Sequence, residues 1–90
     1  MKKTTVLLDP GDVEFLKEYG ISPSRFARRL IRLVMEGKLR APRGKKNEYA
    51  DRVMISLALP EEYISFLREN HINLSALIRE EVKKLKRKLD

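Results

Sequence analysis

The sequence predicts a small, mostly helical fold made of two copies of one strand, helix, turn, helix unit. The first observation is an internal repeat, because a shift of 51 residues aligns residues 4–39 with residues 55–90 without a gap. The second is that each copy opens with alternating apolar residues and continues with two amphipathic stretches. The third is size, because a copy of about 40 residues cannot close a core and a lone strand leaves its backbone groups unpaired. We therefore expect the copies to pack on one another, and neither half to fold by itself.

The repeat also sets the organisation of the chain. The identical pairs are Leu8/Leu59, Phe15/Phe66, Leu16/Leu67, Glu18/Glu69, Ile21/Ile72, Ser24/Ser75 and Arg28/Arg79. We place the first repeat at residues 1–38, a basic linker at 39–51 and the second repeat at 52–90. Pro, Gly and charged residues break any periodicity in the linker. Fully extended, the linker spans about 45 Å, which lets both copies pack within one chain.

Composition limits the classes of partner and site. Apolar residues make up 42% of the 90 residues and charged residues 37%, which is typical of a folded domain. The net charge of +7 makes a polyanion, and nucleic acid first of all, the expected partner. With no Cys and one His, we expect no disulfide, no zinc finger, no metal and no cofactor. No apolar run suggests a membrane span or a signal peptide, so we expect a cytoplasmic protein.

Each copy should begin with a strand that buries one face. In the second copy Val53, Ile55, Leu57 and Leu59 alternate with Met54, Ser56 and Ala58. This period of two is that of a half-buried strand. The 51-residue shift carries the pattern to the first copy, where Thr4, Val6 and Leu8 should point inward and Lys3, Thr5 and Leu7 outward.

The first helix of each copy has clear start and stop signals. Asp9 should cap it with its carboxylate, and Pro10 suits the first helical position because it has no amide hydrogen to leave unpaired. Gly20 should end it in the left-handed conformation. His71 occupies the same position in the second copy, so we assign it to the turn and not to chemistry.

The second helix of each copy should begin at a cluster of capping residues and bury an apolar stripe. The capping residues are Ser22, Ser24, Asn73 and Ser75. The stripe is Phe26, Ala27, Leu30, Ile31 and Val34 in one copy and Leu77, Ile78, Val82, Leu85 and Leu89 in the other. The basic residues from Lys83 to Lys88 suit a helix C-terminus, although an amphipathic basic helix of this kind can also lie on a membrane surface.

These segments resemble the ribbon-helix-helix family of DNA-binding proteins, which includes the Arc, MetJ and CopG repressors. The resemblance rests on the turn from Gly20 to Ser24 with the helix that follows it, and on residues 55–62 and 72–80 of the second copy. It covers all of the chain except the linker. It implies that the two strands pair antiparallel into a ribbon that enters the DNA major groove, supported by four helices.

The resemblance further implies a tandem ribbon-helix-helix pseudo-dimer, as in the single-chain regulators of archaea and their viruses. The expected fold class is therefore mostly α with a two-stranded antiparallel β-ribbon. We expect a monomer that can associate further along DNA. The absence of Gln and Cys, together with many charges, favours a thermophilic source.

The resemblance also assigns site residues. The outward strand residues would read base edges: Lys3, Thr5, Leu7, Met54, Ser56 and Ala58. The starts of the second helices would hold DNA phosphates through Ser22, Ser24, Arg25, Asn73 and Ser75. Lys45 and Lys46 in the linker would add sequence-independent phosphate contacts. The alternatives are a solvated strand face, simple helix capping and solvated linker charges.

We therefore expect a sequence-specific regulator of transcription that binds double-stranded DNA and represses by blocking a promoter. An enzyme is not expected, because the neighbouring acidic residues Glu61 and Glu62, like Glu80 and Glu81, diverge around their helices. No small-molecule substrate is evident. Two other functions stay open: a protein-interaction module such as an antitoxin, and a nonspecific nucleic-acid-binding protein.

Overall fold

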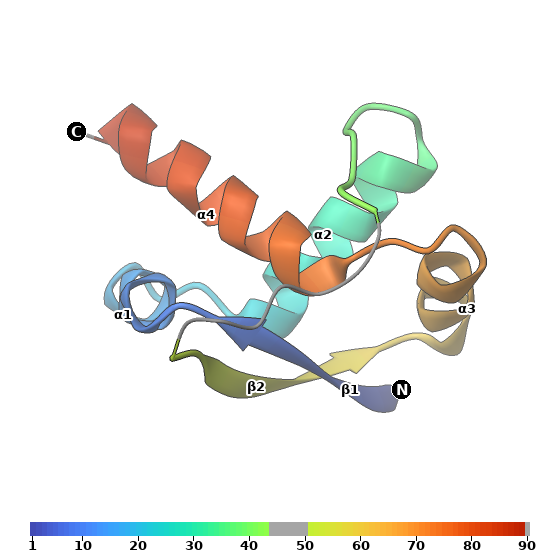
Figure 1. Cartoon of the computed structure of the whole chain (residues 1–90), viewed down its shortest axis with the longest axis horizontal. Helices are drawn as coiled ribbons and strands as arrows, with labels where there is room; N and C mark the ends of the chain where they lie inside the picture. Colours follow the sequence, from blue (N-terminus) through green and yellow to red (C-terminus); the bar gives the residue numbers. More distant parts are fainter. Residues whose placement is uncertain (44–50, 90) are drawn as a thin grey trace.

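Two strands and four helices make up the part of the chain that the structure, a computed structural model, describes: residues 1–43 and 51–89 (Figure 1). In chain order they are β1 (Lys2–Leu8), α1 (Pro10–Glu18), α2 (Pro23–Met35), β2 (Val53–Leu59), α3 (Glu61–Glu69) and α4 (Leu74–Leu89). The bounds of β2 and α3 are those of β1 and α1 shifted by 51 residues. Helix α4 also begins 51 residues after α2, but it runs three residues further.

The two strands form a single antiparallel ribbon, which confirms the predicted pairing. Thr5 lies opposite Ser56 at its centre, with Lys2 opposite Leu59 at one end and Leu8 opposite Val53 at the other. All four helices lie on one side of this ribbon (Figure 1). Helices α2 and α4 cross above its middle, while α1 and α3 lie at opposite ends. Among residues 1–43 and 51–89, no helix lies against the other side of the ribbon.

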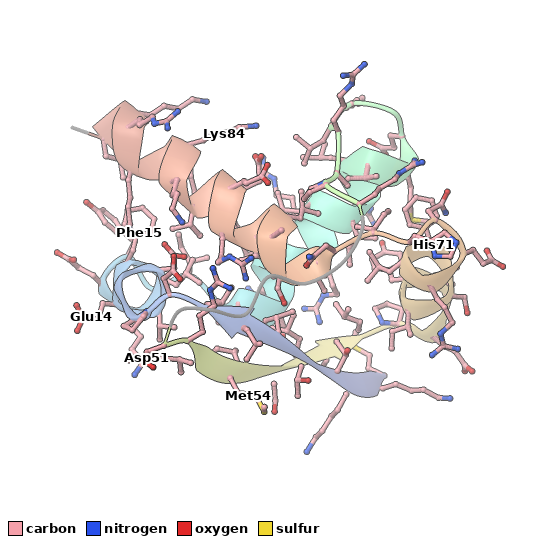
Figure 2. The ribbon with its side chains drawn as sticks, in the orientation of Figure 1. Glu14, Phe15, Asp51, Met54, His71 and Lys84 are labelled. Atoms are coloured by element: carbon pink, nitrogen blue, oxygen red, sulfur yellow. The ribbon has the colours of Figure 1, made fainter. Side chains whose placement is uncertain are left out.

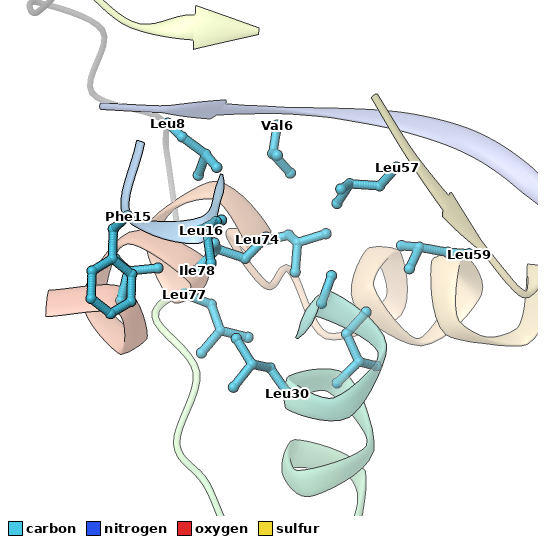
Figure 3. Close-up of a cluster of buried hydrophobic side chains, with 13 residues drawn as sticks. Val6, Leu8, Phe15, Leu16, Leu30, Leu57, Leu59, Leu74, Leu77 and Ile78 are labelled. Carbon is cyan, nitrogen blue, oxygen red and sulfur yellow. The ribbon is translucent and has the colours of Figure 1, made fainter. Parts of the chain in front are cut away.

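The core lies between the ribbon and the helices. Val6, Leu8, Leu57 and Leu59 are at most 2% exposed and point from the strands toward the helices (Figure 3), as the alternation predicts. The helices contribute Phe15, Leu16, Ala27, Leu30, Ile31, Leu74, Leu77, Ile78 and Val82. The prediction for Leu89 was wrong, because this side chain is 57% exposed. The last turn of α4 extends beyond the partners that cover its earlier turns.

The packing crosses between the two copies. Helix α2, from the first copy, packs against β2, and α4, from the second copy, packs against β1. Helices α2 and α4 also contact each other, and α1 packs on α4. Each copy therefore buries its apolar face mainly against the other copy, which is the physical reason for the single shared core.

The turns after α1 and α3 have the predicted backbone. Gly20 has a φ of 64° and His71 a φ of 53°, so both adopt the left-handed conformation at equivalent positions. The next amide then donates back into the helix, from Ile21 N to Leu16 O at 2.8 Å and from Ile72 N to Leu67 O at 3.0 Å. His71 is exposed and serves the turn.

Asp9 does not cap α1 with its side chain, contrary to the sequence prediction. Its backbone is extended and Pro10 opens the helix as expected, but the carboxylate makes no capping hydrogen bond. Instead it accepts from Arg52 Nε at 3.1 Å and from Lys83 Nζ at 3.2 Å. Two cations from the second copy thus outcompete the amides of the first helical turn, because a full positive charge attracts the carboxylate more strongly than the partial charge of an amide does.

The first part of the predicted linker is held against the core. Leu39 and Ala41 are half-buried and pack on core residues. The carbonyl of Pro42 accepts a hydrogen bond from Asn73 N at 2.9 Å, and Arg43 forms an isolated β-bridge with Ile72. The linker residues Lys45 and Lys46 lie outside the described residues.

Candidate nucleic-acid interface

The candidate interface is the side of the ribbon that faces away from the helices. The register places its six side chains in three opposed pairs: Lys3 with Ala58, Thr5 with Ser56, and Leu7 with Met54. All six predicted readout residues are therefore brought together on one surface. Met54 is 67% exposed and points away from the helices (Figure 2). Lys3, Thr5 and Ser56 are exposed, while Leu7 and Ala58 are half-buried.

The outer edge of β1 is held by the start of α4. The amide of Leu7 donates to Ser75 Oγ at 3.0 Å, and Arg79 Nη1 donates to the carbonyl of Leu7 at 2.6 Å. Both backbone groups of Leu7 therefore point away from β2. In an antiparallel pair such residues belong to the non-hydrogen-bonded type, in which the opposed side chains lie closest together.

The outer edge of β2 is held in the same way by the start of α2. The amide of Ala58 donates to Ser24 Oγ at 3.0 Å, and Arg28 Nη1 donates to the carbonyl of Ala58 at 3.0 Å. These four contacts satisfy edge groups that a two-stranded ribbon otherwise leaves to solvent. They also fix both helix starts beside the ribbon.

The structure separates the four predicted capping residues into two pairs. Ser22 Oγ accepts from the amide of Arg25 at 3.5 Å, and Asn73 Oδ1 accepts from the amide of Ala76 at 3.0 Å, as capping predicts. The prediction that Ser24 and Ser75 cap these helices was wrong, because their hydroxyls accept hydrogen bonds from strand amides. Both lie inside the first helical turn, where a side chain can reach a neighbouring strand.

The helix starts differ in how much they expose. Ser22 and Arg25 are exposed at the start of α2, whereas Asn73 is half-buried and Ser75 is 5% exposed at the start of α4. A phosphate near α4 would thus meet backbone amides and not the Ser75 hydroxyl. The positive end of a helix dipole at each start favours an anion there.

Arg28 and Arg79 are the residues that sequence reasoning missed at this surface. Their identity under the 51-residue shift was a signal, because an arginine retained at equivalent positions suggests an equivalent contact. The pKa of Arg79 is lowered from its ordinary value. The larger cause is burial, and the next is repulsion by the positive charge of Arg52.

A cluster of opposite charges fastens α1 to α4 behind the interface. Asp12 is only 1% exposed. Its carboxylate contacts Lys86 Nζ at 3.3 Å and Lys83 Nζ at 3.8 Å. Asp9 binds Lys83 and Arg52. Burial alone would raise the pKa of Asp9, but the hydrogen bonds from Arg52 and Lys83 outweigh it and lower the pKa below its ordinary value of 3.8.

This shift gives stability a dependence on acid pH. A carboxyl group with a lowered pKa in the folded state stabilises the fold fully above its ordinary pKa and loses that contribution as the pH falls through the folded value. We expect Asp9→Asn to lower the free energy of unfolding at pH 7. The difference in this free energy between the variant and the unchanged chain should become smaller as the pH falls from about 5 to about 3. Urea unfolding at each pH measures this. A difference that stays constant over the whole range would contradict the assignment.

Other kinds of site were also sought. Within residues 1–43 and 51–89, no three His, Asp or Glu side chains cluster in a way that could hold a metal ion. In the same ranges no helix has the length and apolar character needed to cross a membrane. Comparisons of the chain with models of known protein families, with curated proteins and with solved structures find no match.

Proposed function

We propose that this protein is a sequence-specific regulator of transcription that inserts its β-ribbon into the major groove of double-stranded DNA and represses by occupying a promoter. In this proposal the chain is a tandem ribbon-helix-helix unit, in which the two copies act as the two halves of a dimer. The observation that carries it is the register, which pairs Thr5 with Ser56. These two residues occupy the same position in the two copies.

The register supports a pseudo-twofold arrangement. When equivalent residues face each other at the centre of an antiparallel pair, the pairs on either side of the centre are related by a twofold axis. The pair of Lys3 with Ala58 therefore corresponds to the pair of Met54 with Leu7. The strand clamps agree with this relation, since Ser24 and Arg28 hold Ala58 as Ser75 and Arg79 hold Leu7. A two-stranded ribbon of this kind fits the major groove, which is about 12 Å wide.

The chemistry of the exposed face suits base edges. Lys3 can donate to guanine O6 or N7, and the hydroxyls of Thr5 and Ser56 can donate or accept. Leu7 and Met54 offer apolar contact to a thymine methyl group. The helix starts beside the ribbon, with Arg25 at one of them, would then meet the flanking phosphates.

The two halves of this face differ, and that difference gives the main test. Lys3, Thr5 and Leu7 stand in one strand where Met54, Ser56 and Ala58 stand in the other. The two DNA half-sites should therefore differ in sequence. Selection from random duplexes, followed by systematic base substitution, is expected to yield an asymmetric site. A strictly palindromic preference would contradict this interpretation.

Single substitutions should separate base readout from phosphate binding. Thr5→Ala or Ser56→Ala is expected to weaken binding by about 1–3 kcal/mol at one or two base positions of the selected site. Arg25→Ala should instead weaken binding to all sequences alike and reduce the salt dependence by about one unit of slope. Titrations of selected and random duplexes at several salt concentrations measure both effects.

The outcome on random DNA tests one function that the sequence left open, that of a nonspecific nucleic-acid-binding protein. Equal losses on selected and random duplexes for Thr5→Ala would place readout elsewhere. Equal affinity of the unchanged chain for selected DNA, random DNA and RNA would indicate a nonspecific nucleic-acid-binding protein.

A further inference from the structure

A hollow of about 490 Å³ lies between α2 and the start of α3, outside the ribbon face. Its lining includes four arginines from one face of α2: Arg25, Arg28, Arg29 and Arg32. The other lining residues are Met1, Pro60, Glu62 and Tyr63. One helix thus contributes four arginines to the wall of a surface concavity.

The charges of these arginines are not neutralised by the residues that the structure describes. Arg28 Nη1 contacts the Ala58 carbonyl and Met1 Sδ, both uncharged. No ion pair among residues 1–43 and 51–89 involves an arginine of α2. Glu62, the acidic lining residue, is exposed and forms no ion pair with these arginines. The hollow therefore carries an excess of positive charge.

The equivalent place in the other half of the molecule is filled. The 51-residue shift relates Pro60 to Asp9 and Tyr63 to Asp12, and it relates Arg32 to Lys83. There the two carboxylates lie among Lys83, Lys86 and Arg52 at 3.1–3.8 Å. At this place, then, Asp9 and Asp12 balance the cations of one half with carboxylates of the chain itself. In the hollow beside α2 the equivalent residues are the uncharged Pro60 and Tyr63.

We propose that this hollow binds an anion of the phosphate class, in the place where the other half holds its own carboxylates. Guanidinium groups present paired donors that match the oxygens of a phosphate, and several together bind it more tightly than isolated charges do. The phosphate belongs either to a DNA backbone that continues past the ribbon or to a free phosphorylated compound. The site itself does not depend on the function proposed above.

The test is a titration of the full chain with inorganic pyrophosphate at constant ionic strength, followed by ¹H–¹⁵N NMR. We expect saturable shifts confined to the amides of α2 and the start of α3. Arg29→Ala/Arg32→Ala should weaken pyrophosphate binding at least tenfold. The matched control, Arg87→Ala/Lys88→Ala, removes two exposed charges from the end of α4 and should leave binding within about twofold of the unchanged chain, as screened charges at a distance contribute little. Equal weakening by both double variants would overturn the proposal, because net charge alone would then explain it.

A second variant tests the comparison between the halves. Pro60→Asp places a carboxylate at the position of Asp9, at a helix start where Asp is a favourable capping residue. It should abolish pyrophosphate binding while the melting temperature is kept or raised. Unchanged pyrophosphate binding in this variant, with the fold intact, would overturn the proposal.

The source of the phosphate follows from a competition. If a random-sequence duplex displaces pyrophosphate, the hollow takes the DNA backbone; if the DNA-bound chain still binds pyrophosphate, it takes a free phosphorylated compound. Both results support the site. A chain that binds pyrophosphate but no duplex would refute the proposed DNA-binding function and leave this site standing.

Discussion

Each half of the chain, prepared alone, is expected to be unfolded. A fragment of residues 1–43 would keep β1, α1 and α2 but would lose the partner strand and the helix that covers β1. Val6 and Leu8, buried in the full chain, would then face water. The fragment of residues 51–90 would lose the corresponding partners of Leu57 and Leu59. Because neither fragment can close a core, the whole free energy of folding should be lost.

Circular dichroism of each fragment should show low helicity and no cooperative melting, and an equimolar mixture should regain both. The mixed pair should be favoured over two copies of one fragment, because Asp9 and Asp12 find Arg52, Lys83 and Lys86 only in the other fragment. As a control, the second fragment with Leu59→Asp should fail to restore folding. A cooperative melt of residues 1–43 alone would contradict the shared core.

Removing both lysines that face Asp12 is expected to destabilise the chain by about 3 kcal/mol. Asp12 is 1% exposed, and its Oδ2 atom has no hydrogen-bond partner among the described residues. Lys83 and Lys86 supply the positive charge that makes this burial tolerable. In Lys83→Met/Lys86→Met the carboxylate would stay buried without compensation, and urea unfolding at pH 7 measures the loss.

Two further variants isolate the cause. Adding Asp12→Leu to the double variant should recover the part of the lost stability that comes from the buried charge, whereas the loss of the contact between Lys83 and Asp9 should remain. Arg87→Met/Lys88→Met, which removes two exposed charges from the same helix, should change stability by no more than about 0.5 kcal/mol. A similar loss in this control, or no recovery with Asp12→Leu, would show that lost helix charge and not the buried carboxylate is responsible.

Much of the fold could be predicted because its signals are local or repeated. The alternation in residues 53–59 predicted the buried side chains of Leu57 and Leu59, and the repeat carried that assignment to Val6 and Leu8. It was wrong for Val53, which is 37% exposed at the end of the ribbon. Gly20 and His71 were placed at left-handed turns by the same alignment. The six side chains of the candidate interface followed from the alternation, since a period of two leaves the other face outward.

Apart from Leu89, which lies in a helix turn that no partner covers, the errors have one physical cause, which is competition from residues distant in sequence. Asp9 reads as a helix cap, but Arg52 and Lys83 reach it from the other copy. Ser24 and Ser75 read as caps, but the strand amides at Ala58 and Leu7 take their hydroxyls. A local pattern gives what a side chain can bind, and the nearest strong partner decides what it does bind.

The sequence by itself determined that the chain has two equivalent copies, which faces of each strand and helix are apolar, and where each turn falls. Periodicity and turn chemistry depend on neighbours along the chain, so no tertiary contact is needed to read them. The sequence also predicted that the segment near Thr5 pairs with the segment near Ser56. Only the tertiary structure decided the exact register of that pair, that each second helix clamps the strand of the other copy, and that one half holds its own carboxylates where the other keeps an arginine-lined hollow. These features depend on register and on distances between residues far apart in the chain, and such distances are fixed only when the two halves close on a common core.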